Sequence, residues 1–573
     1  MQTPLRLKSE RLGKIAIAES NPYLSVLVDT GVFHLDQEFD YSLPAKFDLN
    51  VGDWVSVPFH GRNCLGLITG RSSKDGASKL QQIKPINRAA KGPKISAEHL
   101  RLYQAVAKRW AVPIFDVLRF VSKYRLSASS LETSSQVVQS QGKRSYFQLP
   151  VNKDEVSALR ELVNRVAKTG RTLLIVPEAR IAVQFDGESS FDVAMRGGVL
   201  SPIKYQNVVI LREESEHHFE IKSPGFNSRD VALLRNEFLN ENLVFVGYAP
   251  SLEMVRLIEN GYVSFKRSSG ELKVVAKPSM QGELIPSALV KEFRSALAKG
   301  TVLVIAPTKG YGLAISCASC RNLAKCKCGG KLSKSSKSSP PTCVICATEF
   351  PEWRCAFCNK DRIYLVGRGI ERIAEEFGKT FPNTDIHIAT AEKSIEGEIR
   401  KRSIVLATIG SAPLRLYSAT LILEGTNLGS DMRSEERFLT TLFKHAALSN
   451  GNIMVVERSE HPAINALVKW NPVPYLRRLV DDLNEAQLPP SSRHILIKSE
   501  DSERIYVGLV AALRENRIPA NTRIHNLGNG VISIFFTHKN ANSLLAFIYE
   551  FQKRRSISGK PLMKMRIDPY LLG

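Results

Sequence analysis

The sequence predicts a multi-domain α/β protein, and three observations lead to this fold class. The chain has 573 residues, which corresponds to three to five domains at roughly 100–200 residues each. Its hydrophobic fraction is 43% and its charged fraction is 24%, as in globular proteins with large cores. Helix-like and strand-like segments alternate over most of its length, which is typical of parallel sheets covered by helices.

The N-terminal part predicts a small β-rich domain followed by two helices. Short β-rich runs between residues 24 and 68 are separated by turn residues. Apolar residues then recur at helical spacing in Ile95–Trp110 and Pro113–Tyr124. We place the segments of this part as a tail at 1–21, the domain at 22–130 and a Ser- and Gln-rich linker at 131–145.

Two α/β lobes are predicted next, the first beginning with a helix at Asp154–Lys168 and a strand at Thr172–Val176. The second begins with a helix at Leu289–Ala298, is interrupted by cysteines, and resumes with a strand at Arg362–Gly367. An α+β domain follows the Pro489-Pro490 break. The predicted boundaries are 146–275 for the first lobe, 276–485 for the second, 317–360 for the insert and 486–573 for the C-terminal domain.

Eight of the nine cysteines lie between Cys317 and Cys358, in four closely spaced pairs. A Cys-x2-Cys turn directs two sulfurs to one point, and two such pairs complete the tetrahedral thiolate shell that Zn²⁺ prefers. Eight ligands therefore predict two structural zinc ions per chain, with no ligand position left for water. Buried free thiols and redox pairs are the weaker alternatives. We assign the ligands as Cys317, Cys320, Cys355 and Cys358 for the first ion and Cys326, Cys328, Cys343 and Cys346 for the second.

The net charge of +23 favours a polyanionic partner, most often nucleic acid. Residues 60–130 hold 14 Lys and Arg against three acidic residues, an excess of 11. Residues 321–360 hold eight Lys and Arg against two acidic residues. This excess fits either phosphate contacts or a solvated surface around the thiolates. A separate group, His217-His218 beside three glutamates, is interpreted as an exposed polar loop in preference to a metal site.

A membrane partner is not expected, because no run approaches the ~18 apolar residues that a spanning helix needs. The N-terminus lacks the layout of a signal peptide. We therefore expect a cytoplasmic, nucleoid-associated protein.

Several motifs resemble the primosomal protein N′ (PriA) family of bacterial replication-restart proteins, as does the position of the cysteine cluster between two lobes. The motifs are Phe39-Asp40-Tyr41-Ser42-Leu43-Pro44, Val55-Ser56-Val57-Pro58-Phe59, Phe226-Asn227-Ser228-Arg229-Asp230, Gly369-Ile370-Glu371-Arg372 and Arg566-Ile567-Asp568-Pro569. The resemblance implies RecA-like helicase lobes and an N-terminal domain that holds the 3′ end of the nascent leading strand.

Carried over by motif, the resemblance implies that Phe39 stacks on the terminal base. Asp40 and Tyr41 would bind the base edge or hydroxyl, with Lys84 nearby. Without the resemblance, Phe39 and Tyr41 would be taken as core residues of an alternating strand. The family has a glycine where this chain has His60, which puts a close approach of backbone to DNA in doubt there.

The groups that an ATP-driven helicase needs are missing from the sequence. No phosphate-binding loop of the form G-x-x-x-x-G-K-[ST] is present. Where the family has Asp-Glu-Glu-His, this chain has Arg212-Glu213-Glu214-Ser215, so a cation replaces the metal-binding acid. The arginines of the family's Gly-Arg-x-Gly-Arg segment are replaced within 444–451. The chain therefore resembles degenerate actinobacterial-type members, and ATP hydrolysis is not expected.

The favoured hypothesis is a DNA-binding replication-restart protein that recognises forks, binds the nascent 3′ end and promotes primosome assembly and helicase reloading. The resemblance implies forked and single-stranded DNA, primosome proteins, the replicative helicase or its loader, and single-stranded DNA-binding protein as partners. A 3′–5′ helicase with an unorthodox nucleotide site and a general zinc-ribbon nucleic-acid-binding protein are the alternatives.

Overall fold

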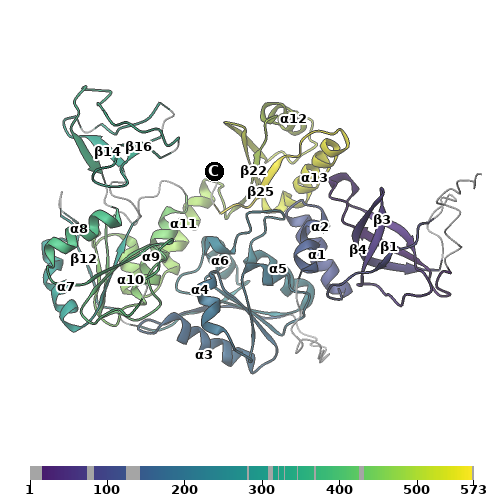
Figure 1. Cartoon of the computed structure of the whole chain (residues 1–573), viewed down its shortest axis with the longest axis horizontal. Coiled ribbons are helices and arrows are strands. Elements are labelled where there is room, and N and C mark those ends of the chain that lie inside the picture. Colours follow the sequence, from purple (N-terminus) through teal and green to yellow (C-terminus); the bar gives the residue numbers. More distant parts are fainter. Residues whose placement is uncertain are drawn as a thin grey trace, which may run out of the picture. The chain divides into compact units, whose positions relative to one another are not determined.

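The computed structural model describes the chain in twelve segments (Figure 1): residues 16–73, 83–123, 142–270, 272–279, 283–307, 314–320, 322–327, 330–344, 346–366, 369–395, 397–424 and 432–570. The chain divides into two compact units. One comprises Met1–Ser145, Val163–Phe245 and Leu483–Gly573, and the other Tyr146–Leu162 and Val246–Asp482. The predicted multi-domain α/β fold with an N-terminal β-domain is confirmed. The predicted tail and linker fall largely outside the described residues.

The N-terminal domain is a five-stranded antiparallel sheet in the order β2-β1-β4-β3-β5. Its strands are β1 (Tyr23–Val28), β2 (Glu38–Ser42), β3 (Trp54–Phe59), β4 (Arg62–Ser72) and β5 (Arg88–Ala89). The segment leading into β5 closes the sheet, because the Ser42 amide donates to the Lys84 carbonyl at 3.0 Å while β5 pairs with β3. Closure leaves few unpaired strand edges and encloses a core that includes Val26, Val55 and Ile68.

Two helices follow this sheet, α1 (Ala97–Arg109) and α2 (Ile114–Ser122). Helix α1 begins where the Ser96 hydroxyl accepts a hydrogen bond from the His99 amide, which satisfies one of the free N–H groups at the helix start. Leu102 and Val106, four residues apart, lie on its buried face.

The first lobe is a six-stranded sheet in the order β11-β6-β10-β9-β7-β8. Its strands are β6 (Arg144–Gln148), β7 (Thr172–Ile175), β8 (Asp192–Ala194), β9 (Asn207–Leu211), β10 (Asn242–Gly247) and β11 (Ser264–Lys266). Its helices are α3 (Glu155–Ala167), α4 (Ala179–Ala182), α5 (Ser228–Leu239) and α6 (Leu252–Glu259). Strands β7 and β9 pair in parallel and are buried along their whole length, as expected of strands covered on both faces.

The second lobe is a parallel sheet in the order β12-β21-β20-β13-β19-β18. Its strands are β12 (Val274–Ala276), β13 (Val302–Ala306), β18 (Ile386–Ala389), β19 (Ile404–Thr408), β20 (Ala419–Ile422) and β21 (Ile453–Val455). Its helices are α7 (Ser287–Lys299), α8 (Ile370–Thr380), α9 (Ser434–Ala446), α10 (Pro462–Val468) and α11 (Val473–Glu485).

The strand predicted at Arg362–Gly367 does not resume the second lobe. It forms β17 (Ile363–Val366), which pairs antiparallel with β14 (Ala314–Cys317). These two strands make a separate two-stranded sheet that includes Cys317. A second small ribbon joins β15 (Leu332–Ser333) and β16 (Thr342–Cys343). The local pattern identified the strand correctly, but it could not identify the partner, because β-propensity reflects packing more than pairing.

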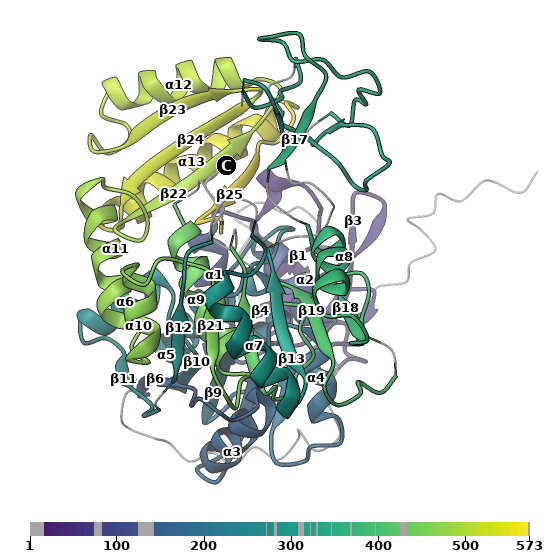
Figure 2. The same ribbon diagram turned by 90° about the vertical axis from the view of Figure 1, so that its left-hand side faces the viewer.

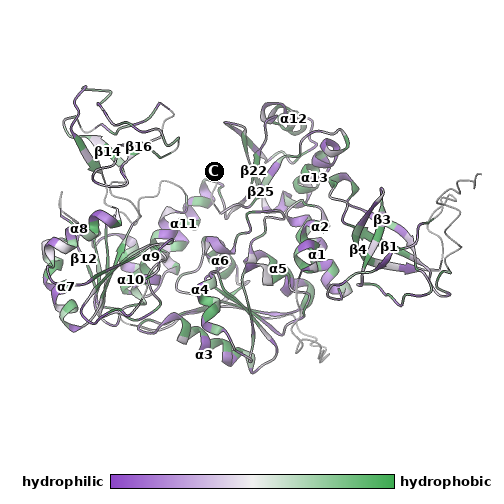
Figure 3. Cartoon of the chain, viewed as in Figure 1, coloured by the Kyte–Doolittle hydropathy of each residue, from purple (hydrophilic) through white to green (hydrophobic). Residues whose placement is uncertain are grey.

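The C-terminal domain is an antiparallel sheet in the order β23-β24-β22-β25 with two helices (Figure 2). Its elements are β22 (Ser492–Lys498), α12 (Ser502–Arg514), β23 (Arg523–Gly528), β24 (Val531–Thr537), α13 (Ala541–Ile557) and β25 (Lys564–Ile567). Figure 3 shows hydrophobic and hydrophilic residues interspersed along its strands and helices, as expected of elements buried on one side. Among the described residues, no helix has both the length and the apolar character that crossing a membrane requires.

Candidate DNA-binding surface, cysteine clusters and the acidic segment

Three of the four predicted DNA-binding residues lie on strand β2. Phe39 is half-buried, and its ring packs edge-on against Phe59 with centroids 5.0 Å apart. Asp40 is exposed and points to the opposite face, because neighbouring strand residues alternate. Lys84 is exposed beside the end of β2, where its carbonyl accepts from Ser42. The structure therefore leaves Asp40 and Lys84 exposed, with Phe39 half-buried on the other face of β2, and their contact with DNA stays a prediction.

Tyr41 differs from the other three because its side chain belongs to the core. The residue is 4% exposed, and its hydroxyl donates to the Pro58 carbonyl at 3.2 Å. Burial raises the pKa of this hydroxyl to about 12. Tyr41 thus matches the core interpretation of the strand, and its ring is not presented to a ligand at the surface.

Two aromatic neighbours extend the Phe39 surface and were not among the predicted site residues. Phe59 ends β3, and the exposed ring of His60 packs against it with centroids 4.8 Å apart. His60 and Gly61 form the tight turn into β4 with φ of +44° and +76°. The left-handed region favours glycine. His60 therefore adopts a backbone conformation typical of glycine although it carries a side chain. The turn residues predict the hairpin, but nothing in the sequence predicts that Phe59 packs against Phe39.

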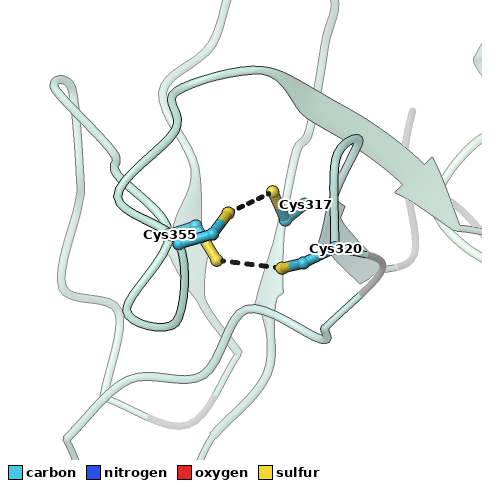
Figure 4. A group of neighbouring side chains, drawn as sticks. Cys317, Cys320 and Cys355 are labelled. Atoms are coloured by element: carbon cyan, nitrogen blue, oxygen red, sulfur yellow. Dashed lines mark hydrogen bonds between the residues drawn. The ribbon is translucent and has the colours of Figure 1, made fainter.

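The first cysteine cluster matches the predicted set (Figure 4). Figure 4 shows Cys317, Cys320 and Cys355 turned toward one another, and Cys358 completes a group whose sulfurs all lie within 4.8 Å. The Sγ atoms of Cys317 and Cys358 are 3.4 Å apart, and those of Cys320 and Cys355 are 3.5 Å apart. Four convergent sulfurs suit a tetrahedral metal ion.

The second cluster brings together Cys326, Cys343 and Cys346, again with sulfurs within 4.8 Å. The Sγ atoms of Cys326 and Cys346 are 3.6 Å apart. Cys328, the fourth predicted ligand, lies outside the described residues. Two metal-compatible clusters therefore exist, one with four described sulfurs and one with three.

The backbone explains the regular and the irregular cysteine spacing. The amides of Cys317, Cys343 and Cys355 each donate to the carbonyl five residues ahead, at 2.9 Å in all three cases. In the turns that begin at Cys343 and Cys355, the residue four positions after the first cysteine, Ala347 or Asn359, has a φ near +58°. The amide of Cys326 instead donates to the Gly330 carbonyl, four residues ahead at 2.8 Å. The Cys-x-Cys spacing thus begins a turn that is one residue shorter.

The acidic segment after β9 is held by internal ion pairs. Arg212 is 2% exposed with φ +50°, and its Nη2 donates to Glu178 Oε1 at 2.8 Å. Glu213 is fully buried and accepts from Arg229 Nη1 at 3.3 Å. Among the described residues, the possible metal-binding groups are the two cysteine clusters and do not include these glutamates.

The loop between β6 and α3 leads from a strand into a helix, the setting in which phosphate-binding loops occur. Asp154 caps the helix start, its Oδ1 accepting from the Ser157 amide at 2.8 Å, and Lys153 pairs with Glu161 at 2.5 Å. A helix start already capped by a carboxylate is a poor phosphate site, because the two anions repel.

The interpretation of His217-His218 as an exposed polar loop is wrong for His218. His217 is exposed, but His218 is fully buried in a short helix at Glu216–His218, and its Nε2 lies 2.8 Å from the Leu211 carbonyl. Burial lowers the pKa of His218 to about 4, so the ring is neutral in the fold. The polar sequence around His218 did not reveal that this side chain lies in the core.

Comparison with known proteins agrees with this architecture. Residues 25–122 match the 3′ DNA-binding domain (3′BD) of PriA. The probable replication restart protein PriA of Mycobacterium tuberculosis is 26% identical over 550 residues, covering 80% of this chain and 84% of that protein. PriA of Mycobacterium leprae is 26% identical, with 80% and 85% covered. Replication restart protein PriA of Rickettsia conorii is 22% identical over 431 residues, with 62% and 65% covered.

Among solved structures, Dbp5 of S. cerevisiae bound to RNA and ADP BeF3 is similar at 9% identity with a TM-score of 0.30, covering 68% of this chain and 97% of that chain. That similarity is too low to bear on the fold. The domain match and the architecture define a multi-domain α/β protein with an N-terminal DNA-binding domain. The chain is thus similar to replication restart protein PriA, including its mycobacterial forms.

Proposed function

We propose that this chain is a replication-restart protein that recognises abandoned forks, binds the 3′ end of the nascent leading strand and promotes reloading of the replicative helicase. The match of residues 25–122 to the 3′ DNA-binding domain carries the proposal. The proposed partners are forked and single-stranded DNA, primosome proteins, the replicative helicase or its loader, and single-stranded DNA-binding protein. Its place of action would be the nucleoid in the cytoplasm.

Phe39 would stack on the terminal base, since base stacking on an aromatic ring contributes ~1–3 kcal/mol and tolerates any sequence. Asp40 and Lys84, both exposed, would contact the base edge or hydroxyl and the backbone. The excess of 11 basic residues between positions 60 and 130 would supply phosphate contacts.

Each cysteine cluster is proposed to hold one structural zinc ion, with Cys328 as the fourth ligand of the second cluster. The donor set fits zinc, because all the converging atoms are sulfurs and sulfur is a preferred ligand of Zn²⁺. Bound zinc would supply folding energy to the small module around it.

We propose that the chain acts without hydrolysing ATP, its two lobes serving as a DNA-gripping frame. Two contacts support this. Arg212, which stands where the resembled family has a metal-binding acid, neutralises Glu178. Asp154 caps the start of the helix that follows β6. A DNA-stimulated ATPase assay on the purified chain with forked DNA tests it. Activity above a no-protein control would contradict it.

End recognition is tested by competition between two forks that differ only at the leading-strand end. One carries a recessed 3′-hydroxyl and the other a 3′-phosphate. A binding pocket for the terminal hydroxyl predicts a clear preference for the first fork. Equal affinity would remove the case for end recognition and leave a general nucleic-acid-binding protein.

A further inference from the structure

The two cysteine clusters differ in how far solvent reaches their sulfurs. In the first cluster two of the four cysteines are buried and two are half-buried. In the second cluster Cys343 is buried, Cys326 is half-buried and Cys346 is exposed. Among the described cysteines of both clusters, Cys346 is therefore the most accessible to a dissolved oxidant. Oxidation of cysteines follows thiolate character and exposure, so the second cluster should react first.

The packing around the clusters explains this difference in exposure. The cysteines of the first cluster lie in or against a small apolar core that contains Ile315 and Trp353. Cys346 lies instead in an exposed turn, where Ala347 and Thr348 are also exposed, and its Sγ is 3.1 Å from the Thr348 hydroxyl. An exposed side chain has little packing to lose. The Cys346 sulfur can therefore move toward a neighbouring sulfur without disturbing the core.

The distances between sulfurs do not separate the two clusters. Cys326 Sγ and Cys346 Sγ are 3.6 Å apart, and the two short sulfur pairs of the first cluster are 3.4 and 3.5 Å apart. All three pairs need only a small approach to reach the bond length of a disulfide, about 2.05 Å. Exposure is therefore the property that distinguishes the second cluster.

We propose that the second cluster is a peroxide-sensitive modification site, at which Cys346 and Cys326 form a reversible disulfide and give up the metal while the first cluster keeps its own. This inference rests on the zinc ions of the proposed function and adds a covalent reaction to them. It assigns different roles to the two clusters, one structural and one responsive to oxidant.

The reaction balances with hydrogen peroxide as the oxidant. Cys346 is a thiolate when it binds a metal ion. Its sulfur attacks one oxygen of the peroxide, so that an S–O bond forms, the O–O bond breaks, and the departing hydroxide takes up a proton to become water. The product is a sulfenic acid. The Cys326 thiolate then attacks this sulfur, an S–S bond forms, the S–O bond breaks, and a second hydroxide leaves and is protonated. The two sulfurs together lose two electrons, which the peroxide accepts.

Loss of these two ligands removes the basis of the second metal site. Only Cys343 and the predicted ligand Cys328 remain, which is too few for a tetrahedral site. Cys343 ends β16, so the ribbon that β16 forms with β15 should loosen. The sheet of β14 and β17 contains Cys317 of the first cluster and should persist. A thiol reductant with zinc should reverse the change, because disulfides exchange with thiolates.

The ninth cysteine is a poor competitor for the oxidant. Cys64 lies on β4 of the N-terminal domain and is half-buried. Burial raises the pKa of its thiol, which lowers the fraction of reactive thiolate.

The test adds hydrogen peroxide to the reduced, zinc-loaded full chain. Released zinc is measured with a colorimetric chelator, bound zinc by native mass spectrometry, and disulfides by peptide mapping with fragmentation. One of the two zinc ions should leave about tenfold faster than the other or more, together with a disulfide between Cys326 and Cys346. Dithiothreitol and zinc should restore both ions. Loss of both ions at one rate, no loss, or a disulfide between any other two cysteines would overturn the proposal.

Two histidine variants supply a matched comparison, because histidine binds zinc but cannot form a disulfide. Dimedone, which traps sulfenic acids, should label Cys346 strongly in Cys326→His, where the second step is blocked. It should label Cys346 no more in Cys320→His, which changes the first cluster, than in the unchanged chain. Equal labelling in the two variants would contradict the reaction sequence. If either variant fails to bind two zinc ions, the disulfide map of the unchanged chain decides.

Failure of this inference can be told apart from failure of the proposed function. Fewer than two zinc ions in the reduced chain, before peroxide is added, would contradict the proposed zinc sites and this inference with them. Two zinc ions that leave together would overturn this inference alone. Binding of a fork with a recessed 3′ end, measured by fluorescence anisotropy before peroxide is added, tests the DNA-binding proposal independently of both.

Discussion

Replacing Arg212 with methionine tests the proposal that internal ion pairs stand where the resembled family has a metal-binding acid. Arg212 and Arg180 both pair with Glu178, through Nη2 at 2.8 Å and Nε at 2.5 Å. Their exposure separates them, because the Arg212 side chain is 3% exposed and that of Arg180 is 35% exposed. Removing one partner of a buried pair costs about 3–5 kcal/mol. Since Glu178 keeps 17% exposure, we expect about 3 kcal/mol for Arg212→Met.

Arg180→Met is the matched control, because it removes an exposed partner of the same carboxylate. Exposed pairs contribute ~1 kcal/mol or less. Hydrogen exchange by mass spectrometry measures the local opening free energy of β7 and β9, which avoids assuming two-state unfolding of a multi-domain chain. Equal effects of the two substitutions, or a loss below about 1 kcal/mol for Arg212→Met, would refute the reasoning.

Three further predictions concern the other sites. Cys343→Ser should release one of two zinc ions per chain in native mass spectrometry, and unchanged metal content would refute the ligand assignment. Burial lowers the pKa of His218 and of His494 to about 4, below the ordinary value near 6.5. Each therefore adds stability that is present above pH 6.5 and is lost toward pH 4, about 1.4 kcal/mol per pH unit. The opening free energy from hydrogen exchange, corrected for the intrinsic exchange rate at each pH, should therefore fall between pH 7 and 5. A flat profile would contradict this. Phe39→Ala should weaken binding to a recessed 3′ end by about tenfold, whereas Tyr41→Phe, which alters a core residue, should leave it unchanged. Equal losses would place the Tyr41 hydroxyl at the DNA beside the Phe39 ring.

The element types were predictable because they depend on local patterns. The strand at Thr172–Val176 became β7, and the helix at Leu289–Ala298 became α7, each within three residues at its ends. The grouping of the cysteines was also predictable, because closely spaced thiol pairs are typical of a shared metal site. The excess of basic residues between positions 60 and 130 follows directly from the amino-acid composition of that segment.

Pairing and burial were not predictable in the same way. The strand at Arg362–Gly367 was expected in the second lobe, yet β17 pairs with β14. His218 follows an exposed histidine, but its ring lies in the core. Tyr41 has the strand position of a core residue, and only the packed domain shows that its hydroxyl is committed to Pro58.

The sequence by itself determined the multi-domain α/β class, the two metal-compatible cysteine sets and the absence of a G-x-x-x-x-G-K-[ST] motif, because each depends on which residues are present and how they are spaced. Only the tertiary structure decided which distant residues meet. It placed Arg212 against Glu178, and it set Lys498 opposite Lys564. Such contacts join residues 34 and 66 positions apart, and they form only where packing of the whole domain brings distant strands together.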